Sequence, residues 1–485
     1  NANANYQDKA IALLQDSLRR NPNDGRAKRT LATLMAGAGG DQWKSAIEML
    51  RSASDDAATP VMDRRLHGVL LFQRDGAENL AEARTIFESL IASAEAEPND
   101  RLILARILER QGDLPGARAQ YEQVGRQTPP DVRGLTFYVD FLIRHADLPE
   151  AQRWLQTLTE ARQGEFDAGT LELQARLLVA QGNSDAVAQQ VDPPALQQLS
   201  TLAADPTAQK ILTAQMGDIY MRLGLHAVAE PWYRRLAELD ANQFAALARC
   251  LARQNRIPDA LDICQQAAAQ SDSPAVAQAV ADVLTSGTPS AADYERVEPI
   301  LAAAEQKYGD DPNTLVKIAY VRIIQGRLDD VIRLLEKVVS VDSKNVLALN
   351  NLASVMSERP PLRAKALEYV DRAIDIIGPR PDLFDTKASI FLYEGQPAQA
   401  VELLEFAVGT AKKDPRYQFH LAAAYFGIGK QDEAARYYRE AIAGGLEQQV
   451  LTQPDRQLMA DMQGLLNSPS PEPTAPGPAQ EAPTP

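Results

Sequence analysis

A small residue that recurs about every 34 positions is the feature of this sequence that most restricts the possible folds. Most successive positions in this series lie 34 to 37 residues apart, and the one interval of 71 residues fits two units. A period of this length, sustained over most of a chain, is typical of a stacked array of short units rather than of separate globular domains. The recurring residues are Ala10, Ala46, Ala83, Ala117, Ala151, Ala186, Ala229, Ala260, Val331, Ala366, Ala400 and Ala434.

The stretch from residue 417 to residue 446 shows what one unit contains: YQFHLAAAYFGIGKQDEAARYYREAIAGGL. Two amphipathic helical patterns flank a turn at Gly429, and the small Ala434 is followed four positions later by Tyr438. Two helices approach to about 8–10 Å only where the residues at their contact are small. The sequence therefore predicts helical hairpins, in which a larger residue four positions after the small one packs on the same face. These larger residues are Phe87, Tyr121, Leu155, Tyr233, Leu335, Leu404 and Tyr438.

This order of small, aromatic and glycine residues resembles the tetratricopeptide repeat (TPR) family. The residues that carry the resemblance are Ala422, Tyr425, Gly429, Ala434, Tyr438 and Ala441. The resemblance covers about residues 1–446 and implies an all-α fold, a right-handed TPR superhelix of about twelve helical hairpins, as in long bacterial arrays. It also implies that the first helix of each hairpin lines a concave surface, on which members of the family hold extended peptides or helices.

We expect the array to occupy residues 1–467, beginning with a lone second helix over residues 1–24. Two irregular stretches are expected, at residues 183–208, where Asp192-Pro193-Pro194 should interrupt a helix, and at residues 271–300. One amphipathic helix over residues 447–467 should cover the end of the stack. Residues 468–485 are rich in proline and have no large apolar residue, which predicts a disordered tail.

Composition and motifs argue against several classes of function. The formal net charge of −15 disfavours nucleic acid and anionic membrane surfaces as partners, and no apolar run is long enough to span a bilayer. The two cysteines, Cys250 and Cys264, have no metal-ligand spacing. The four histidines lie in separate repeats, and the two near predicted turns, His145 and His226, are expected to be solvated. No phosphate-binding loop or hydrolase motif is present. The sequence therefore predicts no catalytic, cofactor-binding or metal site, and a protein that is not an enzyme.

Arginines recur at matching positions of the predicted first helices in the middle of the chain. A basic stripe there would suit an acidic partner segment, because the arginine fork binds carboxylates in a bidentate way. The alternative is that several of them sit in the last turn of a helix, where they complement the helix dipole and pair with nearby acids. These residues are Arg106, Arg110, Arg144, Arg176, Arg222, Arg249 and Arg253.

The same positions of the last repeats are more aromatic. Exposed aromatic side chains on a groove are plausible anchors for a partner segment. The alternative is that some of them belong to the core of their hairpins, which is the commoner place for an aromatic residue at helical spacing. The candidates are Tyr320, Asn350, Tyr393, Phe419 and Phe426.

The leading hypothesis is a non-catalytic scaffold or adaptor that binds protein segments in its concave groove. Two alternatives remain open. The array could be the substrate-recruiting part of a larger enzyme or envelope export machine, because the chain starts in the middle of a hairpin and ends in a proline-rich segment. It could also be a self-assembling array that associates through its exposed N-terminal half repeat. The sequence does not determine the cellular compartment. We expect a soluble protein of either the cytoplasm or the periplasm.

Overall fold

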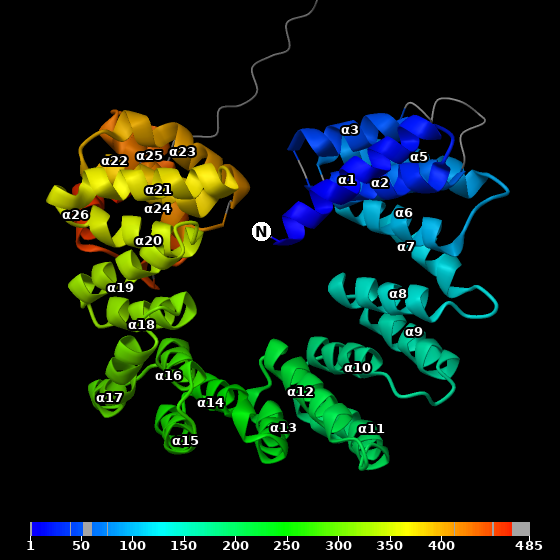
Figure 1. Cartoon of the computed structure of the whole chain (residues 1–485), viewed down its shortest axis with the longest axis horizontal. Helices are drawn as coiled ribbons and strands as arrows, with labels where there is room; N and C mark the ends of the chain where they lie inside the picture. Colours follow the sequence, from blue (N-terminus) through cyan, green and yellow to red (C-terminus); the bar gives the residue numbers. More distant parts are fainter. Residues whose placement is uncertain are drawn as a thin grey trace, which may run out of the picture. The chain divides into compact units, whose positions relative to one another are not determined.

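The chain folds into helices throughout the part that the structure describes (Figure 1). The computed structural model describes residues 2–38, 40–51, 61–74, 76–411, 413–448 and 451–467. The chain divides into two compact units, Asn1–Val228 and Ala229–Pro485, and each is treated by itself. The predicted tail at residues 468–485 lies outside the described residues.

The first unit contains one unpaired helix followed by hairpins. Its elements are α1 (Ala2–Arg20), α2 (Gly25–Ala38), α3 (Gly40–Arg51), α4 (Val61–Arg74), α5 (Ala77–Ala92), α6 (Pro98–Arg110), α7 (Leu114–Gly125), α8 (Val132–Arg144), α9 (Leu148–Ala161), α10 (Ala168–Ala180), η1 (Ser184–Ala186), α11 (Val187–Thr201) and α12 (Pro206–Arg222). The even-numbered helices from α2 to α12 are the first helices of their hairpins.

The second unit continues the same pattern and ends in a shorter helix. Its elements are α13 (His226–Leu239), which begins just before the boundary, η2 (Ala241–Gln243), α14 (Phe244–Arg253), α15 (Ile257–Gln270), α16 (Pro274–Ser286), α17 (Ala291–Lys307), α18 (Pro312–Ile324), α19 (Leu328–Val341), α20 (Val346–Ser357), η3 (Pro360–Leu362), α21 (Arg363–Ile377), α22 (Pro381–Tyr393), α23 (Pro397–Thr410), α24 (Pro415–Gly427), α25 (Gln431–Ala443), η4 (Leu446–Gln448), α26 (Gln453–Asp461) and η5 (Gln463–Asn467). Its first helices are α14, α16, α18, α20, α22 and α24.

The turns of the hairpins follow from local chemistry. Gly112 closes the turn between α6 and α7 with φ of 81°, a left-handed conformation that costs glycine little. Asp113 then caps α7, since its side chain accepts a hydrogen bond from the Gly116 backbone N–H. A proline follows in the first turn of α7, where its missing N–H would have had no helical partner.

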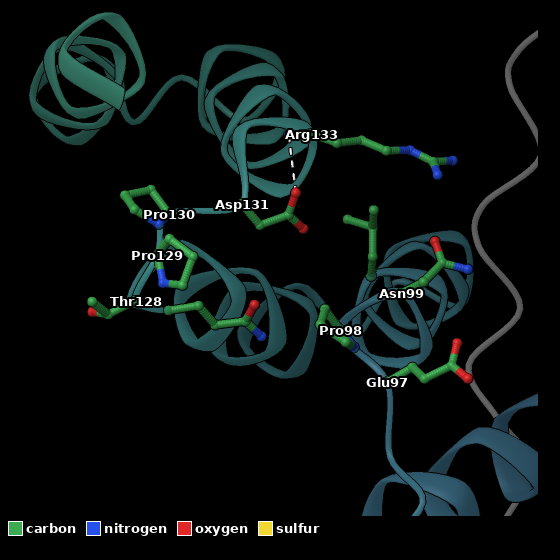
Figure 2. A pocket seen from close by; sticks show the side chains of 10 residues that line it. Glu97, Pro98, Asn99, Thr128, Pro129, Pro130, Asp131 and Arg133 are labelled. Atoms are coloured by element: carbon green, nitrogen blue, oxygen red, sulfur yellow. Dashed lines mark hydrogen bonds between the residues drawn. The ribbon is translucent and has the colours of Figure 1, made fainter. Parts of the chain in front are cut away.

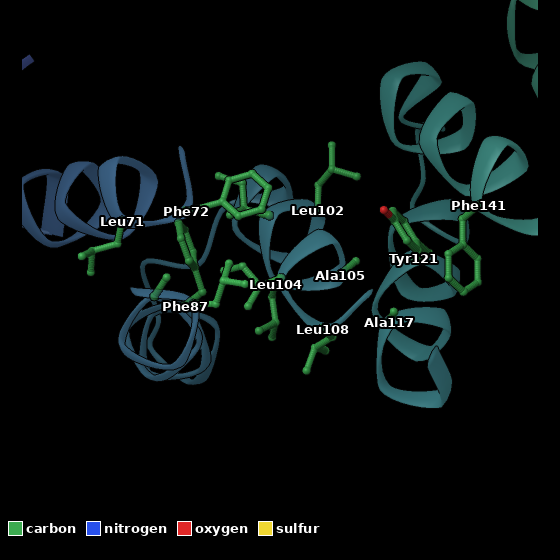
Figure 3. Packing of buried hydrophobic residues seen from close by; sticks show 14 of the residues in the cluster. Leu71, Phe72, Phe87, Leu102, Leu104, Ala105, Leu108, Ala117, Tyr121 and Phe141 are labelled. Carbon is green, nitrogen blue, oxygen red and sulfur yellow. The ribbon is translucent and has the colours of Figure 1, made fainter. Parts of the chain in front are cut away.

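The predicted small residues form the seams between helices. Ala46, Ala83, Ala117 and Ala434, for example, are all fully buried. Around Ala117 the rings of Tyr121 and Phe141 and the side chains of α6 fill the space between hairpins (Figure 3). The all-α fold of stacked helical hairpins is therefore confirmed. One buried apolar cluster extends from Ile11 to Leu177 in the first unit, and another from Ala388 to Leu465 in the second.

Two details of the sequence interpretation of the hairpin at residues 183–208 were wrong. Ala186 is only half-buried, and Val187 occupies the buried position of that hairpin. Pro193 and Pro194 do not interrupt the helix but lie inside α11. A buried stripe formed by Val187, Val191, Ala195 and Leu199 runs through the prolines at a spacing of four residues, so tertiary packing overrides the local preference of proline.

The C-terminal segment also differs from the prediction. Instead of one helix over residues 447–467, the structure has η4, the nine-residue α26 and η5. Met462 and Leu465 are buried, whereas Leu458 and Met459 are half-buried against the same core. The reason for the break lies at Thr452, which starts α26 anew with a capping box closed by Asp455.

Candidate partner-binding surfaces

The five candidate arginines of the first unit lie on its first helices, as predicted, but each of their guanidinium groups already has a partner within the chain. These five are Arg106, Arg110, Arg144, Arg176 and Arg222. Arg106 on α6 lies between two rings, 5.0 Å from the centre of Phe72 and 5.2 Å from that of Phe137. Arg110 stacks over Phe72 at 4.4 Å and donates a hydrogen bond to the Phe72 backbone oxygen at 3.0 Å. Cation–π contacts of this kind orient the guanidinium toward the chain's own rings.

Arg144, Arg176 and Arg222 form ion pairs with acids on neighbouring first helices. Arg144 on α8 binds Glu109 of α6, and also Asp140 at 2.8 Å. Asp140 in turn binds Arg176 of α10. Arg222 of α12 reaches Glu172 of α10 at 2.8 Å.

These pairs change the electrostatics of the first-helix face. Burial would raise the pKa of Glu109, but hydrogen bonds and charge from Arg144 and His145 outweigh it and lower that pKa. A ladder of alternating charges therefore replaces the expected basic stripe in the first unit. For Arg144 and Arg222, which lie in the last turns of their helices, the interpretation as paired arginines is confirmed.

Arg249 and Arg253 differ from the arginines of the first unit. Both lie on α14 in the second unit, and both side chains are exposed. Neither has an ion pair within the ranges of the chain that the structure describes. Their charge is therefore accessible to a ligand.

An exposed apolar surface lies on two further first helices of the same unit, α18 and α20. Tyr320 and Ile324 of α18 are 37% and 56% exposed, and Leu347 of α20 is 49% exposed. The Asn351 side chain donates a hydrogen bond to the Tyr320 hydroxyl at 3.0 Å, which ties the two helices together. We call the surface formed by Tyr320, Ile324 and Leu347 the α18–α20 patch. Beside it, Asn350 keeps a side-chain oxygen that has no hydrogen-bond partner among the described residues.

Two of the predicted aromatic anchors belong to the protein interior instead. Phe419 is fully buried against Tyr438, so its assignment to an exposed surface was wrong. Phe426 is half-buried and packs against the C-terminal core. Both residues lie on α24, a helix enclosed by its hairpin partner α25 and by the preceding α23. Their spacing could not distinguish the core face from the open face.

Tyr393 has a polar partner that the sequence interpretation missed. Its hydroxyl donates to Asp455 of α26 and lies 3.2 Å from the hydroxyl of Thr452. Burial, together with the charge of Asp455, raises the pKa of Tyr393 well above its usual value. The tyrosine is therefore a neutral donor that holds the C-terminal segment on α22.

A buried histidine on α24 contacts the same two helices, α22 and α26. His420 of α24 lies between two carboxylates: its Nδ1 is 2.6 Å from Asp385 of α22, and its Nε2 is 3.1 Å from Asp455. Ionised carboxylates only accept hydrogen bonds, so both ring nitrogens must carry protons and the ring is an imidazolium. Arg416, one turn earlier on α24, adds a second positive charge, 3.1 Å from Asp385.

The titration of the cluster follows from this geometry. Burial alone would lower the pKa of His420, but the charges of Asp385 and Asp455 and their hydrogen bonds raise it to about 10. Burial would raise the pKa of Asp455, yet His420, Tyr393 and Thr452 hold it below its usual range. We call Asp385, Tyr393, Arg416, His420 and Asp455 the His420 cluster.

A hollow on the first unit offers no comparable chemistry. It has a volume of about 640 Å³ and lies between the start of α6 and the loop before α8 (Figure 2). Its carboxylates already have structural roles, since Glu97 pairs with Arg65 at 2.9 Å and Asp131 caps α8 at the Arg133 backbone N–H. No reactive groups converge in it, and over the described ranges no group of three or more His, Cys, Asp or Glu is arranged to hold a metal ion.

None of the described helices combines the length and the apolar composition that crossing a bilayer requires.

The hairpins, their buried small residues and their paired first helices define a helical-repeat protein of the α-solenoid class. Comparison with known families narrows this class. Family models described as tetratricopeptide repeat match residues 74–132, 214–243 and 386–446. These three segments of the chain are tetratricopeptide repeats.

Several solved structures of other proteins match the chain at low identity. The pentatricopeptide repeat protein PPR10 from maize is 15% identical with a TM-score of 0.48; the match covers 94% of this chain and 66% of that one. Naa15/Naa10 bound to HypK-THB is 17% identical with a TM-score of 0.31, covering 96% and 71%. TTC0263, a thermophilic TPR protein in Thermus thermophilus, is 16% identical with a TM-score of 0.32, covering 40% and 100%. No curated protein matches the chain in sequence.

Proposed function

We propose that the chain is a protein-interaction scaffold that binds an acidic partner segment along the first helices of its second unit. Arrays of this family serve in general as scaffolds for protein interactions, and the repeat fold is typically non-catalytic. The observation that supports this particular surface is the α18–α20 patch, an exposed apolar area on the same row of first helices as the accessible Arg249 and Arg253.

The chemistry of the surface favours a segment that is both apolar and acidic. A tyrosine and two aliphatic side chains supply contact area of the kind that dominates interface energetics. Arg249 and Arg253 supply donors for carboxylates. The arginines of the first unit contribute less, because a ligand would have to displace Glu109, Asp140 or Glu172 and leave that carboxylate without its partner.

Affinity capture with matched variants tests this proposal. The full chain is immobilised, a native lysate is passed over it, and retained proteins are eluted with rising salt and identified. The test variant carries Arg249→Ala, Arg253→Ala and Tyr320→Ala. The control carries Arg235→Ala and Arg333→Ala. These changes remove an equal number of positive charges from exposed positions of the second helices α13 and α19.

An acidic protein that the wild type and the control retain, and that the test variant loses, is the expected result. Its elution at moderate salt is expected as well, because exposed charge pairs are screened by ions. Equal retention of every protein by all three forms would refute the proposed surface.

A second candidate function is self-association through α1. Tyr6 and Leu13 lie seven residues apart on one face of this helix and are 71% and 73% exposed. Large apolar side chains exposed together favour a contact with another copy. Light scattering over a range of concentrations should show a mass that rises for the wild type and not for Leu13→Glu. A monomeric mass at all concentrations would contradict self-association.

A further inference from the structure

Within the C-terminal segment, the helix α26 contributes one buried charge to the contact with the second unit. Within α26 the only buried residue is Asp455, which is 3% exposed. The helix has nine residues, and isolated helices shorter than about 12 residues are marginal in water, so its contacts must hold it in place. Leu458 and Met459 are only half-buried, and the fully buried apolar contacts come later, at Met462 and Leu465.

The surface that receives Asp455 is built to bind a carboxylate. On α22 and α24 it contains one negative group, Asp385, and two positive groups, His420 and Arg416. These three groups together have a net charge of about +1, and the carboxylate of Asp455 neutralises it. Tyr393 adds a hydroxyl donor aimed at the same carboxylate oxygen that His420 contacts.

One neighbouring acidic group acts against the charge of Asp455. Glu358, at the end of α20, is half-buried, and its pKa is raised, first by burial and then by the charge of Asp455. Glu358 and Asp455 therefore repel each other, and the contacts of Asp455 with His420 and Tyr393 offset this repulsion. Arg456 follows Asp455 in the segment and moderates the repulsion.

We propose that α22 and α24 form a binding site for a carboxylate at the start of a helix, occupied in cis by Asp455, and that an acidic partner segment replaces α26 there. The segment that fits has a Thr-x-x-Asp start, in which the threonine caps the helix and the aspartate enters the site, as Thr452 and Asp455 do. Apolar residues three, four, seven and ten positions after the aspartate would take the places of Leu458, Met459, Met462 and Leu465.

This site is separate from the α18–α20 patch, and its test does not depend on that patch. If the partner surface of the preceding proposal proves wrong, the binding of a defined peptide to α22 and α24 is still measurable. The binding energy of the segment is also easy to test, because an intramolecular ligand can be weakened by mutation and replaced by a free peptide.

The experiment uses the full chain with Asp455→Asn, which removes the charge and keeps the shape of the side chain. The probe is a labelled, acetylated peptide of residues 451–467, and the matched control peptide carries the same Asp455→Asn change. We expect the native peptide to bind the variant chain at least about tenfold more tightly than the control peptide does, and at least about tenfold more tightly than it binds the wild-type chain. Adding Tyr393→Phe to the variant chain should weaken binding of the native peptide.

Equal binding of the two peptides to the variant chain, or no binding at all, would overturn the proposal. Hydrogen exchange on the wild-type chain provides a second test that needs no variant. A cis segment acts at an effective concentration of about millimolar, so the native peptide at several times that level should increase exchange in α26. Unchanged exchange in α26 under that condition would also overturn the proposal.

Discussion

Raising the pH should weaken the second unit through His420. This histidine has an ordinary pKa of 6.5 and a pKa of about 10 in the folded chain. The folded state therefore binds its proton more tightly, and the resulting stability is fully present below the unfolded pKa. It is lost as the pH rises from about 6.5 toward about 10. The groups that face the imidazolium are Asp385, Ser389 and Tyr393 from α22 and Asp455 from α26.

The size of the effect follows from the two pKa values. One unit of pKa difference corresponds to about 1.4 kcal/mol, so the shift of His420 sets an upper limit of roughly 5 kcal/mol. Between about pH 6 and about pH 9 the free energy of unfolding should fall by about 3 kcal/mol, because most of the proton's stabilising effect is lost over that range.

The assay is pulse proteolysis in urea at both pH values, with cleavage sites mapped by mass spectrometry so that α24 and α26 are followed directly. His420→Gln is the control, because glutamine cannot carry the charge. The wild type should exceed this variant in stability by about 3 kcal/mol more at the lower pH than at the higher. A difference between the two forms that stays constant with pH would refute the assignment of an imidazolium at this position.

Three further predictions concern packing and burial. Gly68→Ala should destabilise the first unit by about 1–3 kcal/mol in thermal unfolding, because the new Cβ would lie 2.8 Å from the ring of Phe87. Gly409→Ala is the matched control: a Cβ there would have no atom within 4 Å, so the change should be neutral or stabilising by up to about 1 kcal/mol. Arg65→Ala should cost about 3–5 kcal/mol, because it leaves the fully buried carboxylate of Asp100 without its bidentate partner; a loss below about 1 kcal/mol would contradict this. Both cysteines should resist a thiol reagent until the chain is unfolded, because burial raises their pKa values to about 11 and about 12, and rapid labelling of the native chain would contradict their burial.

The fold could be predicted because the repeat period is carried by residues whose role depends on size alone. A seam between helices accepts only small side chains, so Ala83 or Ala400 is recognisable without any knowledge of its neighbours. The 71-residue interval, which the sequence analysis assigned to two units, agrees with this logic, since Val297 is fully buried on α17 about midway through it. Local proline preferences were a poorer guide, because packing of α11 overrode them.

The first-helix face was harder to predict because its charges depend on pairs. The arginines Arg144 and Arg176 have acids 35 and 36 residues earlier in the sequence, which places each pair on neighbouring first helices. His420 likewise lies 35 residues from both Asp385 and Asp455. Opposite charges one repeat apart were thus the available signal for the ion pairs and for the buried histidine. Considering each residue within its own repeat hid that signal.

Hydroxyl-radical labelling of side chains, with and without the captured partner, tests the scaffold proposal most directly. The account predicts that Tyr320, Ile324 and Leu347 become protected when the partner binds, while the exposed Tyr6 and Leu13 of α1 keep their labelling. Unchanged labelling of the α18–α20 patch, with protection elsewhere on the chain, would contradict it.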